Sequence, residues 1–163
     1  ILRCPCCLFC ICRRDTHLLP FCSCFIHRIF LDTSKAMKTI ITFGTFDLFH
    51  EGHLGILRRA SEMGDRLVVG VSSDAFNVHK KQRLPVISQN ERMNIVGAIR
   101  YVDEVFLEES MELKQFYVEK YKADVLVMGD DWKGSFDMEG CETVYLPRTE
   151  GVSTTDIIGE IAK

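Results

Sequence analysis

The chain has 163 residues, a formal net charge of -3 and 47% hydrophobic residues. This length suffices for one domain with its own hydrophobic core. The mild negative charge gives no global sign of a protein that binds nucleic acid or a membrane surface, so we expect neither partner. A chain of this charge that binds phosphates has to gather its positive charge locally.

The cysteines are concentrated at the start of the chain. Seven of the eight precede residue 25, and only Cys141 lies in the remainder. A disulfide framework normally runs through the domain that it staples, which this distribution does not do. The lone Cys141 therefore indicates a reducing compartment, and we expect a cytoplasmic protein.

Three interpretations of residues 1–36 compete. Cys7 and Cys10 form a C-x-x-C, but no second well-spaced pair completes a zinc pattern. The apolar runs are too short to span a bilayer, which takes about 20 apolar residues, and no small-residue cleavage site follows a basic start. We favour a non-native or disordered extension that is dispensable, because Met37 directly precedes the first expected strand, and we expect the domain at 37–163.

After Met37, strand and helix patterns alternate along the chain. Apolar, β-branched runs predict strands at 38–43, 66–72, 104–107, 125–128 and 143–146. Helices are expected at 50–63, 89–99, 112–122 and 153–161, and a polar, basic loop at 77–84. The alternation predicts a single α/β, Rossmann-like domain whose five-stranded parallel sheet is covered by helices on both faces. Ligands of such sheets bind at the carboxyl ends of the strands.

The first motif follows the first expected strand and reads GTFDLFHEGH, from Gly44 to His53. Gly44 permits a sharp turn and a close approach to a ligand. His50 and His53 are three positions apart and so share one face at a helix start, where anions are favoured. A lone histidine is usually a surface or core residue, and two histidines without a third ligand are weak evidence for a metal. The combination of strand, glycine turn and histidine pair instead indicates phosphate binding.

This segment resembles the H-x-G-H signature of the nucleotidyltransferase superfamily, in the GTFD-x-x-H-x-G-H form of the cytidylyltransferases. A second segment, RTEGVSTT from Arg148 to Thr155, resembles their RTEGISTT motif with one Val for Ile change. It follows the last strand and opens the last helix, where a plain serine cap would be the common alternative. Arg148 supplies a fixed planar charge for a phosphate.

Two further segments narrow the resemblance. GDDWKGSFD from Gly129 is similar to the GDDWEGKFD run of bacterial glycerol-3-phosphate cytidylyltransferases, and RYVDEV from Arg100 matches another of their runs. The latter resemblance implies a homodimer. The loop His79–Arg83 resembles a family loop whose lysines bind the nucleotide and the acceptor. The loop is about one residue longer here, and one family lysine falls on Gln82. Lys81 or Arg83 is then expected to take the place of that lysine. Lys114 lies where the family has another acceptor lysine.

The resemblance implies transfer of a cytidylyl group from CTP to a small phosphorylated alcohol, sn-glycerol 3-phosphate, giving CDP-glycerol and pyrophosphate. The acceptor phosphate attacks the α-phosphorus directly, and Mg²⁺ accompanies CTP without a protein metal cage. His50, His53 and Arg148 are the expected catalytic residues, and Lys80 and Lys114 the expected acceptor ligands. The expected nucleotide contacts are Gly44, Thr45, Phe46, Asp47, His50, Glu51, Gly52, His53, Lys81, Arg100, Asp130, Arg148, Thr149, Glu150, Gly151, Val152, Ser153, Thr154 and Thr155.

Other functions stay open on the sequence alone. One is a cytidylyltransferase for ethanolamine or choline phosphate, and another is an adenylyltransferase for a sugar phosphate or a flavin. A non-catalytic nucleotide sensor is disfavoured by the intact histidines, Arg148 and Ser153. A metal-binding regulator would depend on the cysteine cluster.

Overall fold

The computed structural model describes residues 36–136 and 138–163, without the side chain of Lys81. Residues 1–35 lie outside this part, so the hypothesis that residues 1–36 are a dispensable extension stays a prediction. The strands are β1 (Thr39–Gly44), β2 (Arg66–Ser72), β3 (Glu104–Glu108), β4 (Val125–Gly129) and β5 (Glu142–Leu146). The helices are α2 (Glu51–Ser61), α3 (Asp74–Lys81), α4 (Gln89–Gly97), α5 (Lys114–Tyr121) and α6 (Thr154–Ile161), with a 3₁₀ turn η1 (Asp130–Trp132).

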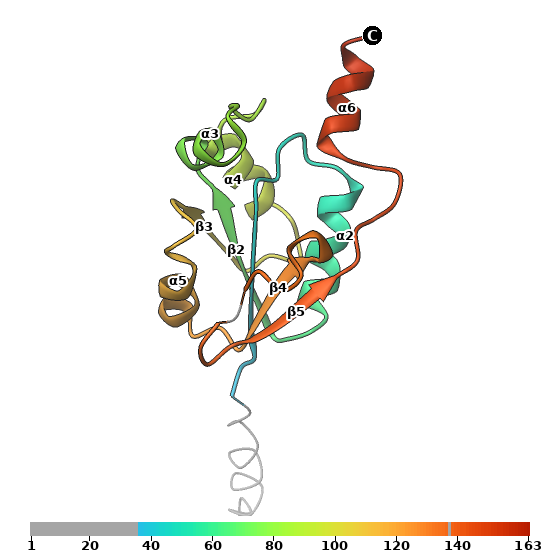
Figure 1. Cartoon of the computed structure of the whole chain (residues 1–163). Coiled ribbons are helices and arrows are strands. Elements are labelled where there is room, and N and C mark those ends of the chain that lie inside the picture. The colour runs from blue at the N-terminus through green and yellow to red at the C-terminus, as the bar shows by residue number, and fades with distance from the viewer. Residues whose placement is uncertain (1–35, 137) are drawn as a thin grey trace, which may run out of the picture. The chain divides into compact units, whose positions relative to one another are not determined.

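The five strands form one parallel sheet in the order β3-β2-β1-β4-β5 (Figure 1). The chain moves outward from β1 through β2 to β3, then returns to the other side of β1 to form β4 and β5. The order therefore reverses between β1 and β4. A crevice opens at such a switch point, outside the carboxyl ends of the strands.

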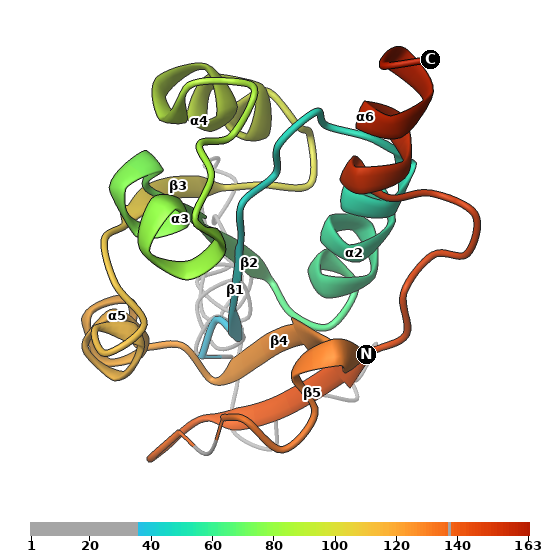
Figure 2. The ribbon, with the colours of Figure 1, turned by 45° about the horizontal axis from the view of Figure 1, so that its top comes forward.

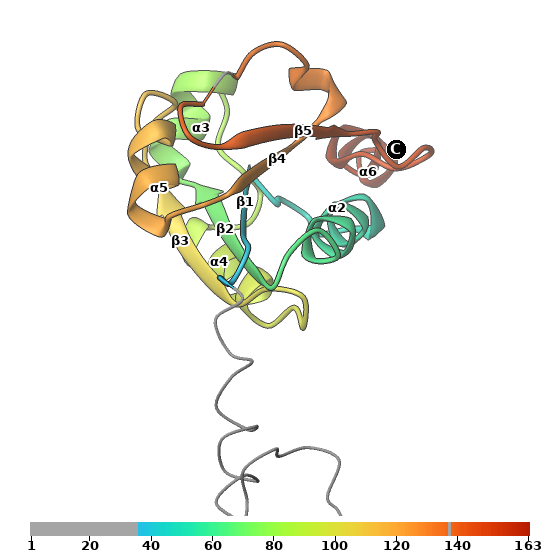
Figure 3. The same cartoon turned by 90° about the horizontal axis from the view of Figure 1, so that it is seen from below.

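Helices cover both faces of the sheet (Figure 3). On one face, α2 and α4 contribute Leu57 and Val96 to a core with the odd-numbered valines of β2. On the other face, α5 contributes Tyr117 and Val118 to a second core. The strands are buried on both faces, which explains why they read as continuous apolar runs rather than as alternating ones. The predicted fold class is confirmed.

The expected loop at 77–84 is wrong over its first half, because residues 74–81 form helix α3. The Ser73 side chain accepts a hydrogen bond from the Phe76 backbone N–H, and Asp74 lies in the first turn. A serine cap followed by an acidic first turn is an ordinary helix start. The remaining predicted elements agree with the structure within a few residues at each end.

The segment after β1 passes between α3 and α4 on one side and α2 and α6 on the other (Figure 2). This places the GTFD turn at the switch point, over the carboxyl ends of the central strands. Within the described residues, no helix combines the length and the apolar character needed to cross a membrane.

Candidate active site

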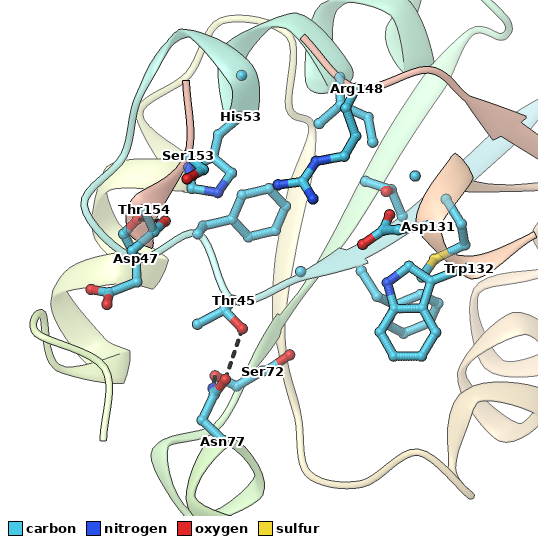
Figure 4. A pocket seen from close by; sticks show the side chains of 18 of the residues that line it. Thr45, Asp47, His53, Ser72, Asn77, Asp131, Trp132, Arg148, Ser153 and Thr154 are labelled. Carbon is cyan, nitrogen blue, oxygen red and sulfur yellow. Dashed lines mark hydrogen bonds between the residues drawn. The ribbon is translucent and has the colours of Figure 1, made fainter. Parts of the chain in front are cut away.

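A pocket of about 330 Å³ lies at the carboxyl ends of the five strands. Side chains from the turn after β1, from η1 and from the start of α6 surround it (Figure 4). Its size suits a small-molecule ligand. Among the expected contacts, those lining it are Gly44, Thr45, Phe46, Asp47, His50, Gly52, His53, Lys80, Lys114, Arg148, Thr149, Val152, Ser153, Thr154 and Thr155.

His50 caps the helix that it precedes. Its Nδ1 atom accepts a hydrogen bond of 3.1 Å from the Gly52 backbone N–H, and its ring stacks on that of His53 with centroids 3.9 Å apart. A neutral imidazole that accepts at Nδ1 carries its proton on Nε2. The cap therefore fixes the tautomer of His50 and leaves Nε2–H as the donor for a ligand.

The charge state of His50 follows from its surroundings. Burial lowers the pKa of His50 below its ordinary value of 6.5, and the nearby Arg148 guanidinium lowers this pKa further. Both effects disfavour the imidazolium. His50 is thus a neutral hydrogen-bond donor at pH 7, and Arg148 supplies a fixed positive charge beside it.

The second motif meets the first at this point. Ser153 caps α6 by accepting from the Asp156 backbone N–H at 3.1 Å, and the Thr154 hydroxyl donates to the Asp47 carbonyl at 3.1 Å. Figure 4 shows the Arg148 guanidinium pointing into the pocket between His53 and Asp131. Two histidines, a guanidinium and a helix N-terminus therefore surround one space, and this donor set is suited to several phosphate groups in a row.

Asp47 has a structural task in addition to lining the pocket. Its carboxylate accepts hydrogen bonds from the backbone N–H groups of Leu48, Val86 and Ile87 at 2.9 to 3.1 Å. These bonds attach the segment before α4 to the turn after β1. A carboxylate engaged in this way orients the turn, since three backbone donors fix its position.

Arg92 is a residue that the sequence analysis missed. It is fully buried and donates to the Ile87 carbonyl at 2.9 Å, the Thr45 carbonyl at 2.5 Å and the Asp74 carboxylate at 2.6 Å. It therefore joins α3, α4 and the turn after β1. An arginine in the middle of a helix carries no local signal of burial, because its partners come from three separate segments.

Two lysines that line the pocket come from other elements than Arg148, namely α3 and the start of α5. The Lys80 ammonium lies 4.1 Å from the centroid of the Trp132 ring, which links α3 to η1 across the pocket. The Lys114 ammonium is buried, 3.7 Å from the centroid of the Phe43 ring. The sequence analysis expected Lys81 or Arg83 to replace a family lysine. Arg83 lines the pocket, whereas the side chain of Lys81 lies outside the described part of the structure.

Several expected contacts lie outside the pocket wall, namely Glu51, Arg100, Asp130, Glu150 and Gly151. Asp131, rather than its neighbour Asp130, lines the pocket, because the 3₁₀ turn rotates consecutive side chains apart. The Arg100 guanidinium instead donates to the Tyr101 hydroxyl at the surface. Any role of these five residues stays a prediction.

A model described as cytidylyltransferase-like matches residues 41–160, which contain most of β1, the other four strands and the residues that line the pocket. The chain belongs to the cytidylyltransferase-like family. The resemblance carried by the H-x-G-H and RTEGVSTT segments is thereby confirmed, and both motifs of this cytidylyltransferase-like chain meet at one pocket.

Two glycerol-3-phosphate cytidylyltransferases are similar to the chain over nearly their whole length, and a third relative over part of its length. The chain is 52% identical over 128 residues to glycerol-3-phosphate cytidylyltransferase of Bacillus subtilis (strain 168), which covers 77% of this chain and 98% of that protein. It is 49% identical over 129 residues to the enzyme of the same name from Staphylococcus aureus (strain NCTC 8325 / PS 47), covering 77% and 96%. Ethanolamine-phosphate cytidylyltransferase of Dictyostelium discoideum is 36% identical over 137 residues, covering 79% and 38%.

The fold is shared with a solved structure of lower similarity. The lipopolysaccharide core biosynthesis protein from Thermoplasma volcanium GSS1 superimposes with a TM-score of 0.57 at 23% identity, covering 69% of this chain and 97% of that one. At this identity the likeness concerns the cytidylyltransferase-like fold alone.

Proposed function

We propose that this protein transfers the cytidylyl group of CTP to sn-glycerol 3-phosphate, giving CDP-glycerol and pyrophosphate. The observation that carries the proposal is that about half of its residues are identical to those of glycerol-3-phosphate cytidylyltransferases over almost their entire length. The pocket supports it, since it brings several phosphate donors and two lysines together and so suits two anionic substrates.

In this reaction an oxygen of the acceptor phosphate attacks the α-phosphorus of CTP. The bond from the α-phosphorus to the bridging oxygen breaks, and pyrophosphate leaves with that electron pair. His50 Nε2–H, His53 and Arg148 stabilise charge on the phosphate oxygens, and the N-terminus of α6 adds backbone donors. No covalent enzyme intermediate is needed, because positioning and charge stabilisation suffice for phosphoryl-type transfer.

We also propose that Mg²⁺ accompanies CTP. The described residues contain no group of three His, Cys, Asp or Glu side chains that would form a protein cage. Asp131 offers one carboxylate at the pocket wall, and one carboxylate with several phosphate oxygens is a typical environment for this ion. When bound, the ion would neutralise charge on the phosphates. An assay with and without EDTA, followed by added Mg²⁺, tests this point.

The substrate choice is tested by product analysis. Purified protein is incubated with CTP or ATP and with glycerol 3-phosphate, ethanolamine phosphate or choline phosphate, and nucleotide products and pyrophosphate are separated by ion-exchange chromatography. We expect CDP-glycerol and an equal amount of pyrophosphate only with CTP and glycerol 3-phosphate. Faster turnover with another acceptor, or with ATP, would contradict the proposal.

We propose a cytoplasmic homodimer. Support comes from the resemblance at Arg100–Val105 and from exposed apolar side chains before and on α4, namely Val86 at 63% and Ile95 at 36% exposure. Apolar side chains gathered at the surface often mark a contact with another subunit. Light scattering at micromolar concentration should give the mass of two chains, and a monomer mass would refute the dimer.

A further inference from the structure

A buried ion pair forms one wall of the pocket, on the side away from the histidines. Glu108 ends β3 and is 1% exposed, and Lys114 begins α5 and is 3% exposed. One carboxylate oxygen of Glu108 binds the Lys114 ammonium, and the other accepts a hydrogen bond of 2.6 Å from the Ser72 hydroxyl. All three residues line the pocket. Figure 4 shows Ser72 at the opposite end of the view from Arg148.

The sheet register places this group. Ser72 pairs with Glu108 at the last rung between β2 and β3, and α5 begins six residues after Glu108. The Lys114 ammonium also lies over two aromatic rings. Its distance is 3.7 Å from the centroid of Phe43, on β1, and 5.4 Å from the centroid of Phe136. The ammonium is therefore held by elements that are rigid parts of the fold.

Stability alone does not account for such a pair. Removing two charges from water is costly, and well-packed apolar side chains of similar volume are often as stable or more stable. Burial lowers the pKa of Lys114, and the Glu108 carboxylate opposes this change. A buried lysine without its carboxylate tends to lose its proton and, with it, its attraction for an anion. A charged pair at a pocket wall is therefore better explained by a ligand that needs the cation.

Each end of the pocket suits a different substrate. His50, His53 and Arg148 surround the space beside the α6 N-terminus, which suits the triphosphate. The end formed by β2, β3 and α5 then remains for the second anion. Lys80 on α3 and Arg83 after it also line the pocket, and the Lys80 ammonium lies over the Trp132 ring of η1.

We propose that Glu108, assisted by Ser72, is a positioning residue that fixes the Lys114 ammonium where it binds the phosphate of the acceptor. The inference rests on the proposed function, since it assumes a phosphorylated acceptor. Glu108 itself need not touch the substrate, because both of its carboxylate oxygens are engaged by Ser72 and Lys114.

The test compares steady-state constants of four variants: Glu108→Gln, Lys114→Met, the double variant and Ser72→Ala. We expect Glu108→Gln to raise KM for glycerol 3-phosphate about 10- to 100-fold, the range of a lost hydrogen bond to a charged group, and KM for CTP less than about twofold. Lys114→Met should do the same. The double variant should be no worse than Lys114→Met alone, because Glu108 acts through that lysine. Ser72→Ala keeps both charges and should have a smaller effect of the same kind.

Glu104→Gln is the matched control. Glu104 lies on the same strand and also pairs with a cation, Arg66, but outside the pocket. This variant should keep both KM values of the unchanged protein. Circular dichroism and thermal unfolding check that each variant is folded, and if Glu108→Gln does not fold, Glu108→Asp takes its place, since it keeps the charge but withdraws it from Lys114.

Three results would overturn the inference. They are an unchanged acceptor KM in the Glu108 variant, an equal rise of both KM values, and an additive effect in the double variant. If the unchanged protein itself makes no CDP-glycerol, the proposed function has failed rather than the role of Glu108. Measuring the unchanged protein first therefore distinguishes a failure of the proposed function from a failure of the role proposed for Glu108.

Discussion

The Nε2 atom of His50 lies 3.5 Å from the Oγ1 atom of Thr154, although the two residues are 104 positions apart in the sequence. The Thr154 hydroxyl donates its proton to the Asp47 carbonyl, so its oxygen faces the Nε2–H of the neutral imidazole. The contact is long and weak. A phosphate oxygen that enters between them would be a stronger acceptor. The Nε2–H group of His50 can therefore leave Thr154 at little cost and donate to a bound phosphate.

Replacing either histidine by alanine should lower kcat on the order of 100- to 1000-fold and affect the affinity for CTP much less. The reason is that these donors act most strongly as charge develops on the phosphate. The two losses should not add, because the rings stack and act on one phosphate chain. His79→Ala, at an exposed position of α3, is the control and should keep normal turnover. Near-normal turnover of His50→Ala and His53→Ala would show that the mechanism is wrong.

The lowered pKa of His50 predicts a pH dependence. Above pH 6.5 the residue is neutral in both the folded and the unfolded chain, and its contribution to stability is complete. As the pH falls below 6.5 the unfolded chain binds the proton first, so the free energy of unfolding declines until the folded pKa is passed. An NMR titration should give a His50 midpoint below 6.5. In Arg148→Met the midpoint should rise only part of the way, because burial is the larger cause; a full return to 6.5 would contradict this assignment.

Gly52 should not tolerate a side chain. A Cβ atom at this position would lie 2.9 Å from the His50 Cε1 atom and 3.3 Å from a methyl group of Val152. Gly52→Ala should therefore displace the His50 ring and lower kcat by at least about tenfold, while the protein stays folded. Gly159→Ala in α6 is the matched control, since nothing lies within 4 Å of its Cβ. It should keep activity and raise stability by about 0.5 to 1 kcal/mol. Equal activities of the two variants would exclude the steric argument.

Arg92→Met should destabilise the fold on the order of 3 kcal/mol, because it removes the Arg92 donors from two carbonyl groups and the cation from the Asp74 carboxylate. Urea unfolding followed by fluorescence of Trp132 measures this change. Arg66→Met removes an ion pair with Glu104 that is part-exposed, and it should cost less than about 1 kcal/mol. Equal losses of stability in both variants would contradict the inference that the buried hydrogen bonds of Arg92 stabilise the fold more than a part-exposed ion pair does.

Local sequence patterns were sufficient for the alternation of strands and helices from Thr39 onward. A continuous apolar strand such as 125–129 or a cap such as Ser88 with Glu91 depends on neighbouring residues only, so it can be predicted from them. The same holds for the helix starts that carry His50 and Ser153. The error at α3 was also local, because the serine cap at Ser73 was present in the sequence and was overlooked.

Contacts between distant segments were decided by the tertiary structure. Ser72 meets Glu108 because β2 and β3 pair in one particular register, and a shift by one residue would turn both side chains away. Arg92 is buried because three segments converge on it, which no pattern within α4 specifies. The sequence by itself therefore determined the strand-helix alternation and the two phosphate-binding motifs. Only the sheet order and register, which depend on packing between remote segments, decided that these motifs share a pocket with a buried ion pair.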